Sequence, residues 1–441
     1  MVLDVLGRIA FGLFGLAMLL MIAVAFSNNR RGIDWKLVGS GVLLQVVFAL
    51  FVLKVPFGEG IFDTLAAGFV SLMGYVGAGS SFIFGNLVNA ANPNIGYVFA
   101  LQVLPTIVFF AALTGVLYHL GIMQKIVQGM AWVITKVMRV SGAETTSVCA
   151  SVFIGQTEAP LTIKPYIERM TEAELMTVMI GGMAHIAGSV MAAYVGLLGH
   201  GNPVQMEFYA KHFLTASIMA APATLMLAKI LIPETQEPLT RGTVRMAVER
   251  STSNIIDAAA SGAGDGLKLA LNVGAMLLAF IALIALLNAP IQWLGTHAWG
   301  GDAANTLNHR LSQVSGGSIH LSMQTIFGWV LAPVAWLIGV PWHDAPLVGS
   351  LIGEKVVINE FVAYTDMSQH LDQLLPQSRL IATYALCGFA NFSSIAIQIG
   401  GIGGIAPNRR GDLARLGLRA VLGGSLATFM TATIAGVISQ I

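Results

Sequence analysis

Two glutamates lie inside otherwise apolar stretches of this sequence, and each stands close to an amide side chain. Glu158 follows Gln156 by two residues, and Glu360 comes directly after Asn359. A carboxylate at membrane depth costs several kcal/mol unless it faces a cavity, a partner or a ligand. The pattern therefore predicts a polar pocket within an apolar environment.

The first of these stretches combines three kinds of hydrogen-bonding group. Gln156 offers a donor and an acceptor, Thr157 a hydroxyl, and Glu158 acceptors only. Such a set suits a planar, neutral, polar ligand such as a nucleobase. Gly155 before it and an Ala-Pro pair after it would let the backbone turn back. The alternative for Gln156 and Thr157 is polar contact between helices.

The second stretch suits a sugar. The Glu360 carboxylate, with Asn359 beside it, could accept hydrogen bonds from two vicinal hydroxyls of a ribose. Asn391 and Ser394 are three residues apart and share a helical face. They could complete a hydroxyl-binding site, with Phe389 as an apolar wall.

The composition is typical of a membrane protein. Of its 441 residues, 56% are hydrophobic and only 10% are charged, whereas a soluble domain carries roughly 25% charged residues. The net charge of +1 gives no case for nucleic-acid binding. Cys149 and Cys387 lie in apolar surroundings, which excludes a disulfide framework. The common metal-binding and nucleophile motifs of enzymes are also missing.

Eight apolar runs approach the roughly 20 residues needed to cross a membrane. They lie near 9–26, 38–56, 98–120, 174–198, 210–232, 268–289, 378–404 and 414–440. Five other pieces are interpreted as too short, broken or polar to cross: 61–90, 121–139, 144–168, 322–341 and 345–366. The positive cluster near the first run follows it, the reverse of a secretory signal, so this run is expected to be a retained helix.

Basic residues mark alternate loops between these runs. They are Arg30, Arg31, Lys36, Lys125, Lys136, Arg139, Lys164, Arg169, Arg241, Arg245, Arg250, Arg409, Arg410, Arg415 and Arg419. The positive-inside rule places those loops in the cytoplasm and both termini outside. An even number of spans agrees with that.

The order of segments repeats along the chain. A span, an amphipathic segment, a hairpin around 144–168 and two further spans form one set, and the order recurs with a hairpin around 345–366. One set begins outside and the other inside, so the repeats are inverted. Inverted repeats with interrupted helices are typical of secondary transporters, with the ligand site at the repeat interface.

We therefore predict an all-α polytopic membrane protein with eight transmembrane helices and two re-entrant helical hairpins. Its expected parts are scaffold spans with an external interfacial segment (1–96), a first repeat (97–232), a cytoplasmic connector (233–266) and a second repeat (267–441). The predicted function is carrier-mediated transport. The alternatives are a membrane enzyme that uses the paired carboxylates as acid and base, and a passive channel.

Two further features need a role in this scheme. Glu354 and Lys355 precede the second stretch and are expected to form an interfacial ion pair that closes the hairpin. His185 lies among small residues over 181–189, which allow close helix packing or local unwinding. Its imidazole is either a protonatable group near a coupling-ion site or a satisfied core residue.

Three motifs in this order closely resemble the concentrative nucleoside transporter family: Gly155–Pro160, Asn359–Tyr364 and Gly388–Ile395. The likeness covers essentially the whole chain and is that of a short bacterial member. It implies nucleoside import by cation symport, without enzyme activity or cofactor. It also implies a homotrimer in the lipid of the bacterial inner membrane, with a periplasmic location for both termini.

The resemblance also implies a division of labour. The first three spans and the sixth would form a scaffold, and the hairpins with their partner spans would move like an elevator. It assigns the nucleobase to Gln156, Thr157, Glu158 and Val190, and the ribose to Glu360, Asn391, Ser394 and Phe389.

The sequence departs from the family at the ion site. Sodium-coupled members carry an Asn shortly before the first hairpin's Gln and a Ser in the next span, plus nearby carbonyls. Here Ser151 and His185 stand at those positions, and Ile154 and Ile186 complete the coupling-ion region. Imidazole is a poor partner for a hard cation that prefers oxygen. We therefore favour H⁺ slightly over Na⁺ as the coupling cation and assign no metal site.

Overall fold

The computed structural model describes residues 2–89, 98–242, 252–298, 306–315 and 320–441. Over these ranges every regular element is a helix, apart from an isolated bridge between Ser141 and Arg241. Arg245, Arg250 and the expected boundary at 96/97 lie outside the described residues. The all-helical prediction is confirmed for the described part of the chain.

Eight helical segments of the described chain are long and apolar enough to cross a membrane. They are α1 (Val2–Ala25), α2 (Trp35–Leu53), α3 (Pro56–Phe84) with the 3₁₀ turn η2 (Gly85–Val88), α4 and α5 (Phe99–Gln102, Leu104–His119), α9 and α10 (Glu172–Ala184, Gly188–Gly199), α11 (Pro203–Leu231), α12 (Ile255–Thr296), and α19 (Arg410–Ile438) with the turn η6 (Pro407–Arg409). The number of candidate spans agrees with the prediction, but two of the segments that make it up differ.

The difference concerns residues 61–90, which are predicted to be unable to cross. By length and composition α3 could cross, because it runs without a break from Pro56 to Phe84, and its interfacial placement stays a prediction. The glycines of α3 are tolerated, since a glycine inside a helix costs only about 1 kcal/mol relative to alanine. In contrast, the expected span at 378–404 consists of two shorter helices, α17 (Pro376–Leu386) and α18 (Phe392–Ile405).

Two helical hairpins occupy the predicted places. The first joins α7 (Gly142–Ser151) to the 3₁₀ turn η3 (Ala159–Ile163) and α8 (Lys164–Ile167), and the second joins α15 (Ala345–Val357) to α16 (Glu360–Gln369). Each follows another helix, the amphipathic α6 (Ile122–Met138) or the apolar α14 (Met323–Leu337). The remaining elements are the short helix α13 (Leu307–Ser315) and the turns η1 (Arg30–Gly32) and η5 (Leu371–Gln373).

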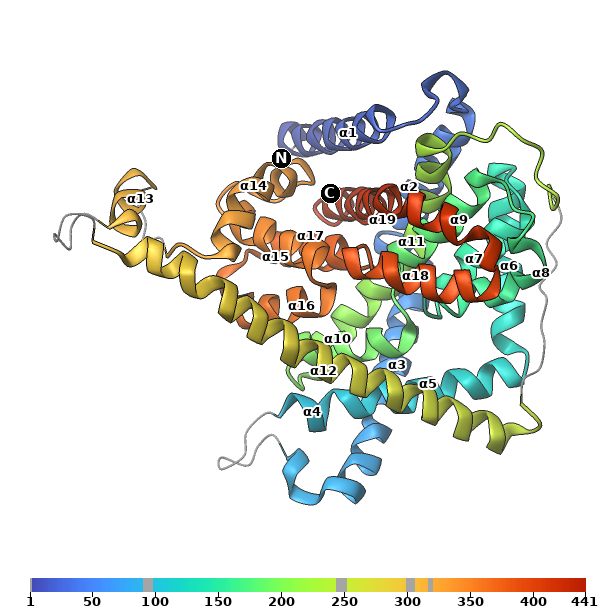
Figure 1. Ribbon diagram of the computed structural model, residues 1–441, viewed down its shortest axis with the longest axis horizontal. Helices are drawn as coiled ribbons and strands as arrows, with labels where there is room; N and C mark the ends of the chain where they lie inside the picture. The colour runs from blue at the N-terminus through green and yellow to red at the C-terminus, as the bar shows by residue number, and fades with distance from the viewer. Residues whose placement is uncertain (1, 90–97, 243–251, 299–305, 316–319) are drawn as a thin grey trace.

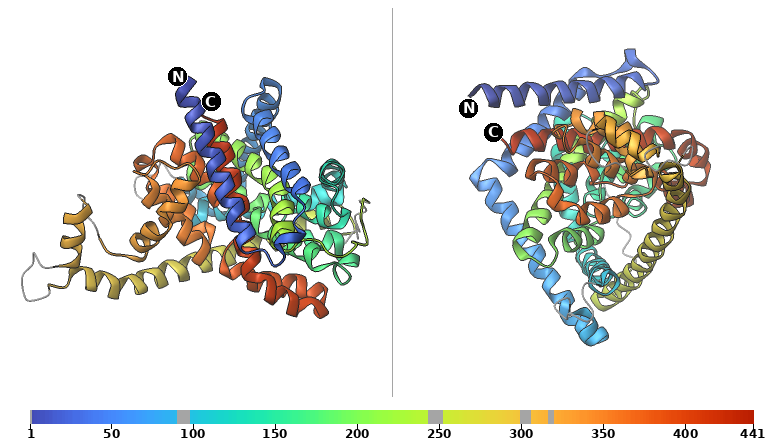
Figure 2. Two further views of the ribbon diagram at one scale, coloured as in Figure 1. Left: turned by 90° about the horizontal axis from the view of Figure 1, so that it is seen from above. Right: turned by 90° about the vertical axis from the view of Figure 1, so that its left-hand side faces the viewer.

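The interior and the edge of the molecule consist of different helices. The most apolar stretches of α9–α10, α11 and α19 are each 89% buried, whereas that of α12 is only 17% buried. Helix α12 runs along one edge against α5 and extends past the body toward α13 (Figures 1 and 2). Gly262 and Gly266 allow this packing, since a Cβ at Gly266 would lie 2.7 Å from the Ala111 Cβ.

Both interrupted helices break in the interior and meet there. Helix α9 ends at Ala184 and α10 begins at Gly188, while α17 ends at Leu386 and α18 begins at Phe392. Gly388 lies in the second break with φ +156°, and a Cβ there would lie 2.8 Å from the Met183 carbonyl oxygen. The two breaks therefore contact each other through backbone.

Candidate functional site

A cavity of about 1050 Å³ lies between the hairpins, the broken helices and the α5–α12 pair. All eight side chains expected at the ligand site line it: Gln156, Thr157, Glu158, Val190, Glu360, Phe389, Asn391 and Ser394. These residues come from four segments that are far apart in sequence. The fold therefore brings the two polar stretches onto one cavity.

Glu360 is the best-held carboxylate of this cavity. It is the first residue of α16 and is only 6% exposed. Its Oε1 accepts a hydrogen bond from the Tyr194 hydroxyl at 2.8 Å, and its Oε2 accepts one from the Asn391 amide at 3.1 Å. A carboxylate offers about four lone-pair positions, so two donors leave acceptor capacity for a ligand.

Two asparagines of the site are also helix caps. The Asn391 Oδ1 accepts from the Ser394 backbone N–H at 2.9 Å at the start of α18, and the Asn359 Oδ1 accepts from the Val362 N–H at 2.9 Å at the start of α16. Capping fixes each amide, so that its NH₂ group points away from its helix. Asn359 lines the cavity, and its NH₂ group is buried without a partner within the described chain.

A chain of amides joins the first hairpin to α18. Gln156 donates to the Ser394 hydroxyl at 3.1 Å, and Gln398 donates both to Gln156 Oε1 at 3.2 Å and to the Met179 carbonyl at 2.9 Å. Gln156 is therefore held at both ends of its amide. These contacts place the expected base-facing and sugar-facing groups in one hydrogen-bonded network.

The other expected base-side residues contribute surface to the cavity. Glu158 is exposed to it and forms no ion pair within the described chain. Thr157 and Phe389 are half-buried, and Val190 is buried on α10. Glu158 thus differs from Glu360, because its carboxylate is not fixed by neighbouring side chains.

Only one of the residues expected in the coupling-ion region lines the cavity. The Ser151 hydroxyl donates to the Ser147 carbonyl at 3.0 Å within α7. His185 ends α9, and its Nδ1 lies 2.7 Å from the Gly181 carbonyl, so this nitrogen carries the proton. Its Nε2 is buried without a partner in the described chain. Of the four expected residues only Ile154 lines the cavity; Ile186 is buried.

The described residues hold no cluster of three or more histidine, cysteine or acidic side chains that could bind a metal ion.

The predicted ion pair between Glu354 and Lys355 is wrong. Consecutive helical residues point in different directions. Glu354 accepts from the Gln324 amide of α14 at 3.1 Å, while Lys355 donates to the Ala385 carbonyl at 3.0 Å. The two charges thus connect the second hairpin to two different neighbours.

Two residues of the network were not predicted from the sequence. Tyr194 follows Val190 by four positions on α10, and Gln398 follows Ser394 by four positions on α18. Helical spacing of i and i+4 puts each on the face of its predicted neighbour. That spacing is the signal that could have found them.

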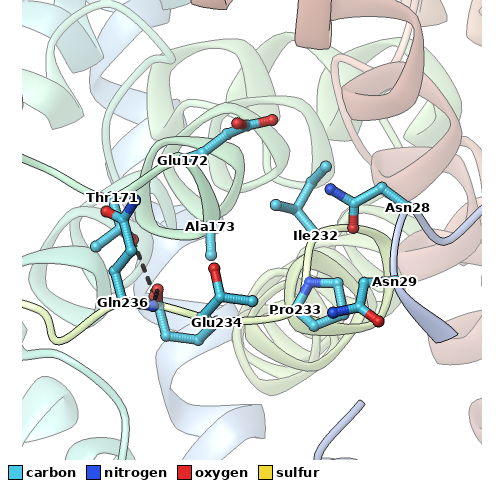
Figure 3. Close-up of a pocket in the computed structure, with 10 residues that line it drawn as sticks. Asn28, Asn29, Thr171, Glu172, Ala173, Ile232, Pro233, Glu234 and Gln236 are labelled. Atoms are coloured by element: carbon cyan, nitrogen blue, oxygen red, sulfur yellow. Dashed lines mark hydrogen bonds between the residues drawn. The ribbon is translucent and has the colours of Figure 1, made fainter. Parts of the chain in front are cut away.

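A second, smaller pocket lies outside the expected ligand site. It has a volume of about 230 Å³ and is formed by the start of α9 and the segments after α1 and α11 (Figure 3). There the Thr171 hydroxyl donates to Glu234 at 2.9 Å, and Glu234 also pairs with the buried Lys229. It shares no lining residue with the large cavity.

Comparisons with known proteins agree with this arrangement. Family models described as the N-terminus and C-terminus of a Na⁺-dependent nucleoside transporter match residues 14–87 and 212–436, and one described as "Nucleoside recognition" matches 100–201. An uncharacterized transporter of Haemophilus influenzae is 43% identical over 96% of both chains. Nucleoside permease NupC of Helicobacter pylori is 38% identical over 97% of both.

A solved structure gives the same result in three dimensions. CNTnw in an inward-facing substrate-bound state matches 98% of both chains at 42% identity, with a TM-score of 0.84. The relatives are nucleoside transporters and permeases, not enzymes. The chain is therefore a multi-pass membrane protein that belongs to the concentrative nucleoside transporter family.

Proposed function

We propose that this protein imports nucleosides across the bacterial inner membrane by cation symport. The observation that carries the proposal is the network around Glu360, which faces the amides of Gln156 and Asn359 across one cavity. Such an arrangement offers acceptors to a sugar and a donor–acceptor pair to a base. Import needs no bond chemistry, only a site that reorients.

In this proposal Glu360 accepts hydrogen bonds from the two ribose hydroxyls, while Asn391 and Ser394 surround them. Phe389 packs against the sugar. Gln156, Thr157 and Glu158 read the nucleobase, and Val190 provides its apolar contact. The cavity extends to Lys164 and Thr252, near loops that the positive-inside rule places in the cytoplasm, as expected for an inward-open state.

We favour H⁺ as the coupling cation. The Ser151 hydroxyl is engaged within its own helix, and the unpartnered Nε2 of His185 is a basic nitrogen rather than an oxygen ligand. An imidazole nitrogen can take up a proton and is unsuited to bind Na⁺. The matching family models are described as Na⁺-dependent, so Na⁺ is the alternative to be tested.

The proposed mechanism is an elevator within a homotrimer, with both termini in the periplasm. The scaffold would comprise α1, α2, α5 and α12, and the moving part would contain both hairpins and both broken helices. The shared network of Gln156, Gln398 and Ser394 supports this division, because it ties one hairpin to the broken helix of the other repeat. A unit connected in this way can move as one body.

The deciding experiment is uptake of labelled uridine into proteoliposomes under a Na⁺ gradient alone and then under a proton gradient alone. We expect uphill accumulation with the proton gradient. Accumulation that depends on Na⁺ and ignores pH would overturn the coupling proposal. Equilibration without accumulation under either gradient would indicate a channel.

Glu360→Gln is expected to abolish uptake while assembly is retained. The amide replaces one acceptor by a donor, so it cannot accept from both ribose hydroxyls, and hydrogen bonds to a charged group contribute roughly 1.5–3 kcal/mol each. The readouts are uridine uptake and the oligomeric state in detergent.

Glu354→Gln is the matched control, because Glu354 is a buried carboxylate of the same hairpin that lies outside the cavity lining. Its uptake should stay near that of the wild type. Unchanged uridine accumulation by Glu360→Gln would refute the ribose assignment.

A further inference from the structure

Lys355 is a buried cation without an acidic partner. Its side chain is fully buried at the end of α15, and no carboxylate of the described chain lies within 4.0 Å of its ammonium. By comparison, the buried Lys229 pairs with Glu144 and Glu234, each at 2.9 Å. Glu360 acts on this ammonium only electrostatically, from beyond that distance. A buried charge without a direct partner is costly, so its retention calls for a role.

The contacts of this ammonium tie three elements together. It donates to the Ala385 carbonyl near the end of α17 at 3.0 Å and to the Thr428 hydroxyl of α19 at 3.0 Å. It also lies 5.7 Å from the centre of the Phe429 ring. All three are neutral groups that attract a cation: a helix C-terminal carbonyl, a hydroxyl and a ring face.

The position of Lys355 matches that of the first repeat's cation region. Ser151 stands five residues before Gln156, and Lys355 stands five residues before Glu360. Each occupies the hairpin helix that leads to a ligand-facing residue. In the first repeat Ser151 faces Gly181, one turn before α9 ends, and in the second Lys355 reaches the corresponding end of α17.

The geometry points to Lys355 as a tethered cation, a positioning residue that does in the second repeat what a mobile cation would do in the first. Helix C-terminal ends concentrate negative potential, and transporters use such ends to hold coupling ions. Here a covalently attached ammonium satisfies the end of α17. The inference rests on the proposed function, because it gives the tether the task of holding the ribose site.

The Lys355 ammonium links the two segments that carry the ribose-site residues. Lys355 lies on the helix that leads into Asn359 and Glu360, while Ala385 lies just before the break that carries Phe389 and Asn391. The hydrogen bond that the Asn391 amide donates to Glu360 links the same two segments on the cavity side. Removing the ammonium should therefore loosen the spacing between Glu360 and Asn391 and weaken uridine binding.

The test compares Lys355→Met, which keeps length without charge, with Lys355→Arg and with the surface control Lys136→Met. Uridine affinity and thermal midpoint are measured on the purified full-length protein. We expect Lys355→Met to bind uridine about tenfold or more weakly. Its thermal midpoint should be unchanged or raised, since an apolar group replacing an unpaired buried charge is often neutral or stabilising. Lys355→Arg should recover part of the affinity.

A chemical rescue separates charge from packing. Lys355→Ala removes the atoms beyond Cβ, which n-propylammonium can replace and 1-propanol can replace only in shape. Recovery of uridine binding by the amine alone supports the tether. Equal recovery by both compounds, or wild-type affinity in Lys355→Met, overturns it.

The rescue also distinguishes this inference from the proposed function. A wild type that does not bind uridine contradicts the proposed function. The tether is then tested by the thermal midpoint of Lys355→Ala: a rise with amine but not with alcohol supports it, and equal effects of the two overturn it.

Discussion

The hydrogen bonds that orient the Glu360 carboxylate come from neutral donors, and the Lys355 ammonium acts on it only from a greater distance. Tyr194 holds one oxygen and Asn391 the other. Tyr194 is completely buried and does not line the cavity, so its role is to position the carboxylate and not to contact the nucleoside. Neutral donors leave the charge of the carboxylate available to ribose hydroxyls.

Tyr194→Phe tests this role. The substitution keeps the ring packing and removes one hydrogen bond to a charged acceptor, which contributes roughly 1.5–3 kcal/mol. We expect the KM for uridine uptake to rise about tenfold with little change in expression.

Tyr364→Phe is the matched control for that variant. Its ring lies 4.6 Å from that of Tyr194, and its hydroxyl donates instead to the Thr383 carbonyl at 2.8 Å. If both variants raise KM equally, the hydroxyl of Tyr194 has no special role.

The coupling ion is also decided at the scale of single residues. The double variant Ser151→Asn with His185→Ser restores the side chains that sodium-coupled members carry. We expect it to gain stimulation of uridine uptake by Na⁺ and to lose the response to a proton gradient, because an amide oxygen replaces the Ser151 hydroxyl and a hydroxyl oxygen replaces the His185 imidazole.

His212→Gln serves as the control for the double variant, since His212 is a buried histidine bound to the Tyr384 hydroxyl outside the cavity. It should keep the response to a proton gradient. A double variant that remains indifferent to Na⁺ would contradict the assignment of the ion region.

The site roles of charged and amide residues in apolar stretches could be predicted from the sequence. The role of a tyrosine could not, because a tyrosine is also common in a packed core. Glu360, Asn391 and Gln156 stand out because a membrane interior penalises them, and the fold brings them together. Tyr194 sits in a run of small apolar residues where a tyrosine suggests packing. The direction of Lys355 could not be predicted either, because it depends on α17 and α19, which are adjacent only in three dimensions.

At the scale of elements, the site depends on two interrupted helices. Breaks after Ala184 and Leu386 free the backbone and side-chain groups that surround the ligand. The small residues over 181–189 allowed either close packing or local unwinding, and the first break lies there. The glycines of α3 do not interrupt that helix, because glycines spread along a helix are tolerated when nothing else breaks it.

Gly388→Ala should damage the contact between the two breaks. Its Cβ would lie 2.8 Å from the Met183 carbonyl oxygen, at a φ of +156° that side chains rarely adopt. We expect a loss of about 1–3 kcal/mol in stability, seen as a lower thermal midpoint. Gly400→Ala is the control, since nothing lies within 4 Å of its Cβ. Equal midpoints for the two variants would mean that the breaks can separate freely.

At the scale of the molecule, the chain pairs a buried interior with an exposed frame. Helices α9–α11 and α19 form the buried interior beside the site. Helix α12 lines the cavity with one face and presents large apolar side chains outward on another, among them Leu271, Leu278 and Leu286. Composition and periodicity predicted that these segments are helical and apolar. They did not predict which segments would be buried and which exposed, because segments of both kinds are equally apolar.

The length of α12 has a mechanical consequence. Its 42 residues span about 63 Å at roughly 1.5 Å per residue, about twice the roughly 30 Å of the hydrocarbon layer. Part of it must lie oblique or project beyond the bilayer, so its tilt should respond to lipid thickness. We expect uridine transport rates in vesicles to pass through a maximum as acyl chains are lengthened, while uridine affinity stays constant. Transport rates that do not change with acyl-chain length would show that the tilt of α12 does not affect transport.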